Sequence, residues 1–165
     1  MTDALSAIEK FAAFMRFLAP PEPANSPGTA ESRATGKMLF TSLGCAHCHT
    51  PTLTTGPSSV AALSNKPVNL YSDLLLHYMG PRLSDGVSQG QAGPREFRTA
   101  PLWGLGQRIF FLHDGRTKDL LEVIQLHRSG SSSNGDASEP SAVITRYNQL
   151  REDQKQDLVN FLRSL

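Results

Sequence analysis

The sequence predicts an all-α fold whose helices are joined by long irregular loops. Apolar residues recur at helical spacing in segments near both ends of the chain. The stretches between these segments are rich in glycine, proline, serine and threonine. No alternation of strands and helices, typical of a parallel sheet, is visible. A length of 165 residues suits one domain, or one domain with an appendage.

The first expected helix covers residues 3–19. Its apolar residues share one face at helical spacing: Ile8, Phe11, Met15 and Leu18. Two prolines end this helix, and residues 20–29 (PPEPANSPGT) form a proline-rich linker of semi-extended character. The helix also echoes the end of the chain, because FMRFL from Phe14 is similar to FLRSL from Phe161.

The middle of the chain is expected to contain one helix and two loops. The helix is expected over residues 30–43 and ends at Gly44, since glycine favours helix C-termini. Residues 50–68 and 80–101 are expected to be irregular because of their Thr, Ser, Gly and Pro content. Residues 70–79 (LYSDLLLHYM) are short and apolar, and their periodicity fits a helix or a strand.

Three further helices are expected in the last third of the chain. Thr117 is the expected N-cap of a helix that reaches about His127. One face of that helix carries Leu120, Val123, Ile124 and His127. The segment SGSSSNGD is a flexible surface loop, and residues 142–150 form a short helix. The last helix covers residues 151–165, and its expected inward face carries Leu158, Phe161, Leu162 and Leu165.

The most informative motif follows Gly44. Cys45, Cys48 and His49 form C-x-x-C-H, the attachment signature of a c-type haem. Each cysteine sulfur forms a thioether to the porphyrin, and His49 supplies the proximal imidazole of the iron. A thioredoxin-like redox pair would accompany a βαβ pattern, and a zinc site would need further nearby ligands. We therefore expect one covalent haem c in a cytochrome c-like haem domain, with no disulfide because haem uses both cysteines.

Charge and hydropathy give no support for a nucleic-acid-binding protein or for a membrane-spanning one. The net charge of +1 gives no reason to expect nucleic-acid binding, and no apolar run approaches the length of a membrane span. Haem is attached to C-x-x-C-H outside the cytoplasm, which predicts a periplasmic protein. Residues 1–20 lack the pattern of an export signal, so we expect the chain to be a fragment or to begin downstream of its native start.

The residues leave the distal iron ligand open. The candidates are His127, Met79, His113, His77 and Met38. His127 ends the apolar face of its helix, so its imidazole needs a buried partner. Met79 precedes Gly80-Pro81, where a loop can place a thioether over the haem, and a His/Met iron has a raised potential. If neither residue reaches the iron, the open position favours peroxide.

Four other residues are candidates for contacts with the haem. Arg98 and Arg108 are expected to bind its propionates because a guanidinium matches a carboxylate in a two-bond fork. Trp103 is expected either to pack against the porphyrin edge or to form part of the core. His113, in FLHDG, is expected to bond a propionate or the backbone of its own loop.

A series of segments narrows the interpretation further. These are LFTSLGCAHCHTPTLTTG, LYSDLLLHYMGPRLSDG, EFRTAPLWGLG, FLHDGR and LVNFLRSL. In this order they resemble the C-terminal haem domain of the di-haem oxidoreductases, also labelled thiol oxidoreductases, which are similar to bacterial di-haem cytochrome c peroxidases. The resemblance runs from about residue 5 to the end. The serine-rich loop at 129–135 departs from it, because a Gly-Gly-Glu-like segment is expected there.

The resemblance implies a division of the chain and a function. Residues 1–19 would be the closing helix of an upstream haem domain, 20–29 a linker, and 30–165 the haem domain. The resemblance places His127 at the distal ligand position, with Met79 as the alternative. The implied function is single-electron transfer within a peroxidase-like enzyme, together with the upstream haem domain or a redox partner protein. A stand-alone electron carrier without catalytic activity is the alternative, so whether the chain is itself an enzyme stays open.

Overall fold

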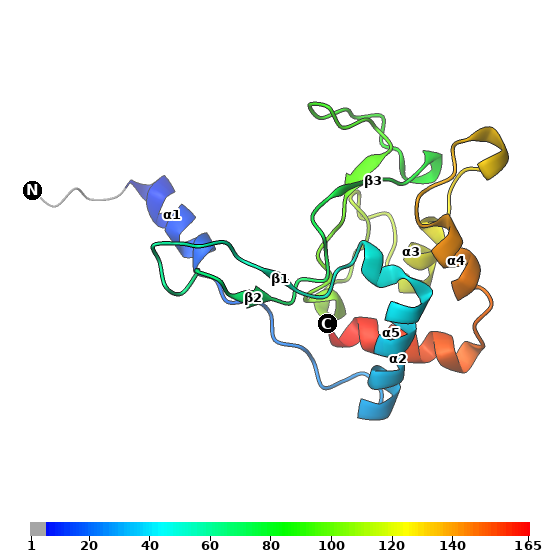
Figure 1. Cartoon of the computed structure of the whole chain (residues 1–165), viewed down its shortest axis with the longest axis horizontal. Helices are drawn as coiled ribbons and strands as arrows, with labels where there is room; N and C mark the ends of the chain where they lie inside the picture. Colours follow the sequence, from blue (N-terminus) through cyan, green and yellow to red (C-terminus); the bar gives the residue numbers. More distant parts are fainter. Residues whose placement is uncertain (1–5) are drawn as a thin grey trace, which may run out of the picture.

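The structure is a computed structural model that describes residues 6–165. In chain order its helices and strands are α1 (Ala7–Arg16), α2 (Ala30–Leu43), β1 (Leu53–Thr54), β2 (Pro67–Val68), β3 (Leu76–Tyr78), β4 (Glu96–Arg98), α3 (Leu120–Leu126), α4 (Ser141–Tyr147) and α5 (Glu152–Ser164). Single 3-10 turns lie at Cys45–His47, Pro81–Leu83, Leu105–Gln107 and Ser132–Asn134. Figure 1 shows α2 and α5 crossing at the base of the molecule, with the loops, α3 and α4 above them.

The expectation of an all-α fold is wrong, because the described chain is a mixed α/β structure. The strands β1 and β2 pair antiparallel, as do β3 and β4. Part of residues 70–79, for which a helix was equally possible, forms β3, where Leu76 pairs with Arg98 and Tyr78 with Glu96. The expected loop at 50–68 contains both β1 and β2, and the expected loop at 80–101 contains β4, because extended backbone groups bond across a sheet. A cytochrome c-like fold is not confirmed.

The crossing of α2 and α5 organises the core. Gly36 lies at the crossing, where an added Cβ would meet the backbone of Asp157 and lie 2.7 Å from Cβ of Phe161. The hydroxyl of Ser32 donates to Asp157 Oδ1 at 2.5 Å beside the same contact. The buried cluster around the crossing contains Phe40, Leu43, Leu105, Phe111, Leu120, Tyr147, Leu158, Phe161 and Leu162. The inward face expected for the last helix is therefore confirmed for its first three members.

The expected ends of the helices hold to within a few residues. Gly44 closes α2 with φ +99, in the left-handed region that favours glycine. The N-cap of α3 is Asp119, whose side chain accepts from Leu121 N, and not the expected Thr117. The hydroxyl oxygen of Thr117, two residues before this N-cap, instead accepts from Asp119 N. His127 is the residue directly after α3, at its C-cap.

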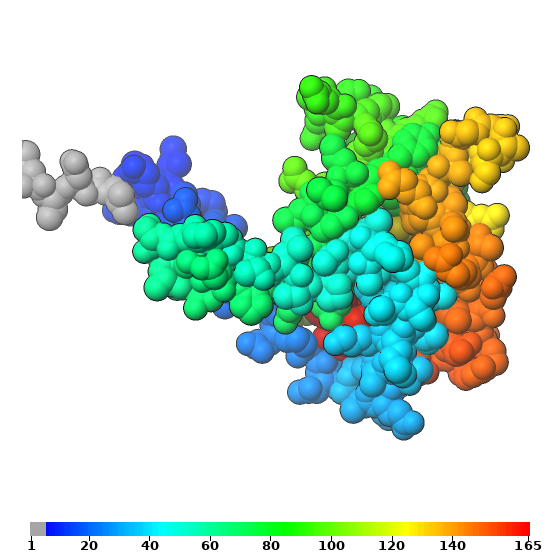
Figure 2. Space-filling model, in the orientation of Figure 1, coloured from blue at the N-terminus to red at the C-terminus, as the bar shows by residue number. Residues whose placement is uncertain are grey.

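The helix α1 has no buried residue. It extends from the body beside the β1–β2 hairpin, as Figures 1 and 2 show. Its apolar face is open to solvent, with 81% of Ile8, 64% of Phe11 and 59% of Phe14 exposed. The first part of the helix expected over 3–19 includes residues 3–5, which lie outside the described residues. The assignment of residues 1–19 to an upstream domain stays a prediction.

Within residues 6–165, every helix is too short or too polar to cross a lipid bilayer.

Candidate haem site

The C-x-x-C-H segment begins where α2 ends. After Gly44, the chain makes a 3-10 turn over Cys45–His47, and the amide of His49 donates to Cys45 O at 3.0 Å. The Arg146 guanidinium of α4 caps the end of α2 by donating to Leu43 O, from Nε at 2.9 Å and from Nη2 at 2.5 Å. These bonds fix the turn that presents the motif.

His49 is held as a neutral imidazole with one nitrogen available. Its Nδ1–H donates to the carbonyl oxygen of Tyr71 at 3.1 Å, which leaves the lone pair on Nε2. Burial first, and the neighbouring His127 second, lower the pKa of His49 to about 4 against the opposing effect of the Tyr71 carbonyl. The ring is therefore uncharged at neutral pH, as a metal ligand must be.

His127 repeats this arrangement from the end of α3. Its Nδ1–H donates to Val123 O at 2.8 Å, one helical turn earlier, so its Nε2 also keeps a lone pair. Burial lowers the pKa of His127. The centroids of the His49 and His127 rings lie 6.3 Å apart, with 55° between the ring planes.

This pair fits a single metal atom. Imidazole nitrogens bind first-row metals at about 2 Å, so two imidazoles on opposite sides of one metal have centroids roughly 6 Å apart. The backbone bond at each Nδ1 fixes the tautomer, as is usual for histidines that bind metals. Together with two cysteines beside His49, the donor set fits an iron porphyrin attached through sulfur.

Both cysteines are thiols in the described chain. Burial raises the pKa of Cys45 to about 11, and burial with the nearby charges of Asp73 and Glu139 raises that of Cys48. Raised pKa values give little thiolate at neutral pH, which disfavours a reactive redox pair. Thioether formation removes the acidic proton altogether.

The structure does not gather the other predicted residues around the imidazole pair. Met79 follows β3 and is half-buried, with its amide bonded to Arg95 O. Arg98 is exposed on β4, Trp103 is half-buried, and exposed Arg108 donates to Pro101 O. His113 packs on Phe97, with ring centroids 4.5 Å apart, and lies 3.8 Å from Asp85. Their roles toward haem stay predictions.

Sequence reasoning missed a group of side chains beside Cys48. Instead of facing solvent, His77 lies between two carboxylates, with Nε2 2.9 Å from Asp73 and Nδ1 2.6 Å from Glu139. Burial works to lower the pKa of His77, but the bonds to Glu139 and Asp73 outweigh it and raise the pKa. The i, i+4 spacing of Asp73 and His77 was a visible signal, whereas nothing in the sequence marked Glu139.

Cys48, Asp73 and His77 also place potential metal-ligand atoms within 4.8 Å of one another. However, each imidazole nitrogen of His77 already donates to a carboxylate. The group is therefore an ion-pair network that touches the haem motif, with Cys48 Sγ 3.7 Å from His77 Nδ1.

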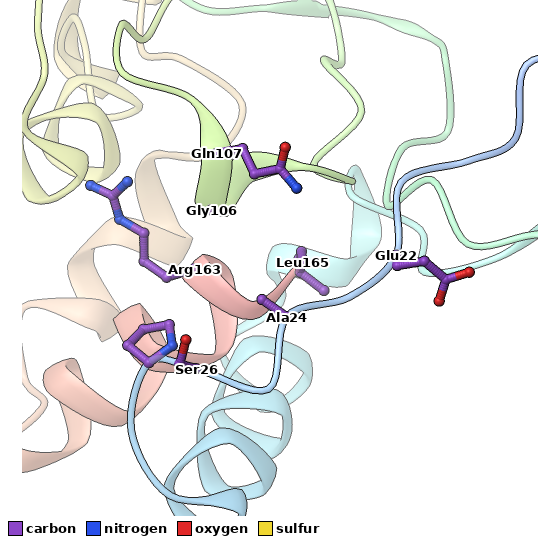
Figure 3. A pocket seen from close by; sticks show the side chains of 8 residues that line it. Glu22, Ala24, Ser26, Gly106, Gln107, Arg163 and Leu165 are labelled. Atoms are coloured by element: carbon purple, nitrogen blue, oxygen red, sulfur yellow. The ribbon is translucent and has the colours of Figure 1, made fainter.

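Two surface hollows lie apart from the imidazole pair. One of about 440 Å³ lies between the linker, Gly106 and the end of α5, where Glu22 and Arg163 point away from each other (Figure 3). The other, of about 600 Å³, is lined by hydroxyls of the serine-rich loop with Arg128 and Arg146. Neither is lined by the C-x-x-C-H residues or by His127.

A half-buried pair of neutral imidazoles at a C-x-x-C-H motif is typical of a haem-binding class of redox protein. A family model described as "Di-haem oxidoreductase, putative peroxidase" matches residues 3–165. The chain therefore belongs to the di-haem oxidoreductase family. This confirms the resemblance found in the sequence and shows that haem is the family's cofactor.

A solved structure supports the fold. The chain is similar to a chain of Kuenenia stuttgartiensis hydrazine synthase, with a TM-score of 0.62 and 20% sequence identity. The alignment covers 96% of this chain and 55% of the other, so this chain spans about half the length of that neighbour. At this identity the likeness concerns the fold alone. No curated protein matches the sequence.

Proposed function

We propose that this chain carries one haem c and passes single electrons as the C-terminal part of a periplasmic, peroxidase-like di-haem oxidoreductase. The observation that carries the proposal is the pair of half-buried, neutral imidazoles, His49 and His127, with centroids 6.3 Å apart beside C-x-x-C-H. When bound, haem supplies a one-electron Fe(III)/Fe(II) couple.

The protein residues would have separate duties toward the haem. Cys45 and Cys48 would bind the porphyrin through thioethers, and His49 and His127 would hold the iron from its two sides. The carbonyls of Tyr71 and Val123 keep the protons on Nδ1 of the two rings, so that both Nε2 atoms stay available. Both residues are half-buried, and the lowered pKa that this burial causes keeps each ring neutral.

An iron held by His49 and His127 together would favour electron transfer over peroxide chemistry at this haem. A di-haem family implies a second, upstream haem domain, where substrate chemistry would take place. We propose α1 as the closing helix of that domain, because its apolar face is exposed here and echoes α5. The isolated chain should therefore show little peroxidase turnover, and brisk turnover would contradict this division of labour.

The test of haem attachment is the mass of the protein matured in a periplasm that can attach haem. The wild type should gain the mass of one haem, show a c-type pyridine haemochrome spectrum, and keep its colour in acid–acetone. Replacing Cys45 and Cys48 by Ala should release the haem into the solvent phase. A colourless wild type without added mass would contradict the proposal.

The alternative is a stand-alone electron carrier without catalytic activity. The coding sequence upstream of the chain distinguishes the two. A second C-x-x-C-H there supports the enzyme, whereas its absence supports the carrier.

A further inference from the structure

We propose that Asp73, His77 and Glu139, here called the carboxylate–imidazole bridge, are positioning residues that keep His127 on the iron. The inference rests on the proposed function, because it concerns haem held between His49 and His127. It assigns a role to three side chains that have no place in haem attachment or iron ligation.

Asp73, the first residue of the bridge, is bonded to the C-x-x-C-H segment that contains His49. The amide of Asp73 donates to Cys48 O at 2.8 Å, and the amide of Ser72 donates to Thr50 O at 2.9 Å. The carbonyl of Tyr71, two residues before Asp73, accepts from His49 Nδ1. The segment 71–73 is thus hydrogen-bonded along the C-x-x-C-H segment. These bonds fix the position of the Asp73 carboxylate relative to the motif.

The second half reaches the distal side. Glu139 accepts from His77 Nδ1 at 2.6 Å through Oε2 and from the amide of Tyr78 at 2.7 Å through Oε1. The neighbouring hydroxyl of Ser138 donates to the carbonyl oxygen of His127 at 2.6 Å. Ser138 is only 3% exposed. Because Ser138 and Glu139 are adjacent, fixing the Glu139 side chain also fixes the backbone of His127.

His77 is the central element of this path. Both ring nitrogens face carboxylate oxygens, and 16% of its side chain is exposed. A rigid imidazole between two acceptors fixes their separation, as hydrogen-bonded partners of metal ligands do for ligand orientation. Within residues 6–165, the other histidine–carboxylate contact, His113 with Asp85, is longer at 3.8 Å.

The experiment uses the haem-bearing full chain and measures two properties at the iron. They are the high-spin fraction in the optical spectrum and the rate at which cyanide replaces His127. Glu139→Gln and His77→Ala should raise that rate about tenfold, the usual lower limit for losing a partner of a metal ligand. His77→Gln, which keeps a side-chain amide in the gap, should recover part of the loss. Asp85→Asn is the matched control and should stay within twofold.

Each outcome decides the matter. Glu139→Gln keeps an oxygen for the amide of Tyr78, so it tests the bridge even if His77→Ala does not fold. If thermal unfolding changes while the cyanide rate and spin state equal those of the wild type, the bridge is merely structural and the inference is overturned. A coloured wild type with unchanged variants overturns this inference alone. A colourless wild type overturns the proposed function and this inference together.

Discussion

The ring centroids of His49 and His127 lie 6.3 Å apart, and each ring donates its Nδ1–H to a backbone carbonyl. The two residues come from opposite halves of the chain, one after α2 and one after α3. This shared geometry, together with the motif, is the basis of the proposal that both imidazoles hold the iron.

Replacing His127 by Ala should convert the haem-bearing protein from a low-spin to a largely high-spin spectrum, because one axial nitrogen is lost. Optical absorption measures the change. His47→Ala is the matched control, since His47 is exposed and lies within the same motif. If His127→Ala leaves the spectrum unchanged and Met79→Leu alters it, the ligand is Met79.

The thiols should show the pH dependence that their burial implies. With a pKa of about 11, Cys45 in the haem-free protein has roughly two hundredfold less thiolate at pH 8 than an ordinary thiol of pKa about 8.5. Its alkylation should be slow at pH 8 and should accelerate as pH rises toward 11, because the thiolate is the reacting form. Peptide mapping after timed alkylation measures this. The denatured protein is the control, and equal rates in both states would refute the prediction.

Gly36→Ala should destabilise the protein by about 2 kcal/mol, the scale of overpacking in a tight core. An added Cβ would collide with the backbone of Asp157 and press on Phe161, neither of which yields easily. The gain in helix propensity, about 1 kcal/mol, is too small to compensate. Chemical denaturation measures the change. Gly56→Ala is the control, because an added Cβ there meets nothing within 4 Å, and an equal loss in both variants would contradict the explanation.

The two echoing helices should respond differently to the same truncation. Phe161→Ala should cost about 3–5 kcal/mol of unfolding free energy, because the side chain is 4% exposed in the core. Phe14→Ala should change it by less than about 0.5 kcal/mol, because that ring is 59% exposed. A large loss for Phe14→Ala would show that α1 packs on this domain and not on another.

The sequence predicted burial best for a helix whose single apolar face packs on the core. Leu158, Phe161 and Leu162 could be placed inside because their spacing is helical and α5 buries that stripe. The strand β3 could not be assigned, since Leu74, Leu75 and Leu76 are consecutive and all exposed. Three consecutive leucines show neither the alternation of a strand nor the spacing of an amphipathic helix.

Sequence reasoning named both imidazoles that the structure places close together, but not the contacts that hold them. His49 was marked by its motif and His127 by its position at the end of an apolar face. The acceptors are backbone carbonyls of Tyr71 and Val123, which no side-chain pattern reveals. Glu139 meets His77 only through the tertiary fold, so nothing local could indicate it.

The linker also limits how far a domain seated on α1 could move. The amide of Ala24 donates to Ser164 O at 2.8 Å, which fastens the linker to the end of α5. Only residues 17–23 remain between that anchor and Arg16, and seven extended residues span at most roughly 25 Å. With so short a connection, electron exchange between this domain and a domain seated on α1 would be an intramolecular event, independent of protein concentration.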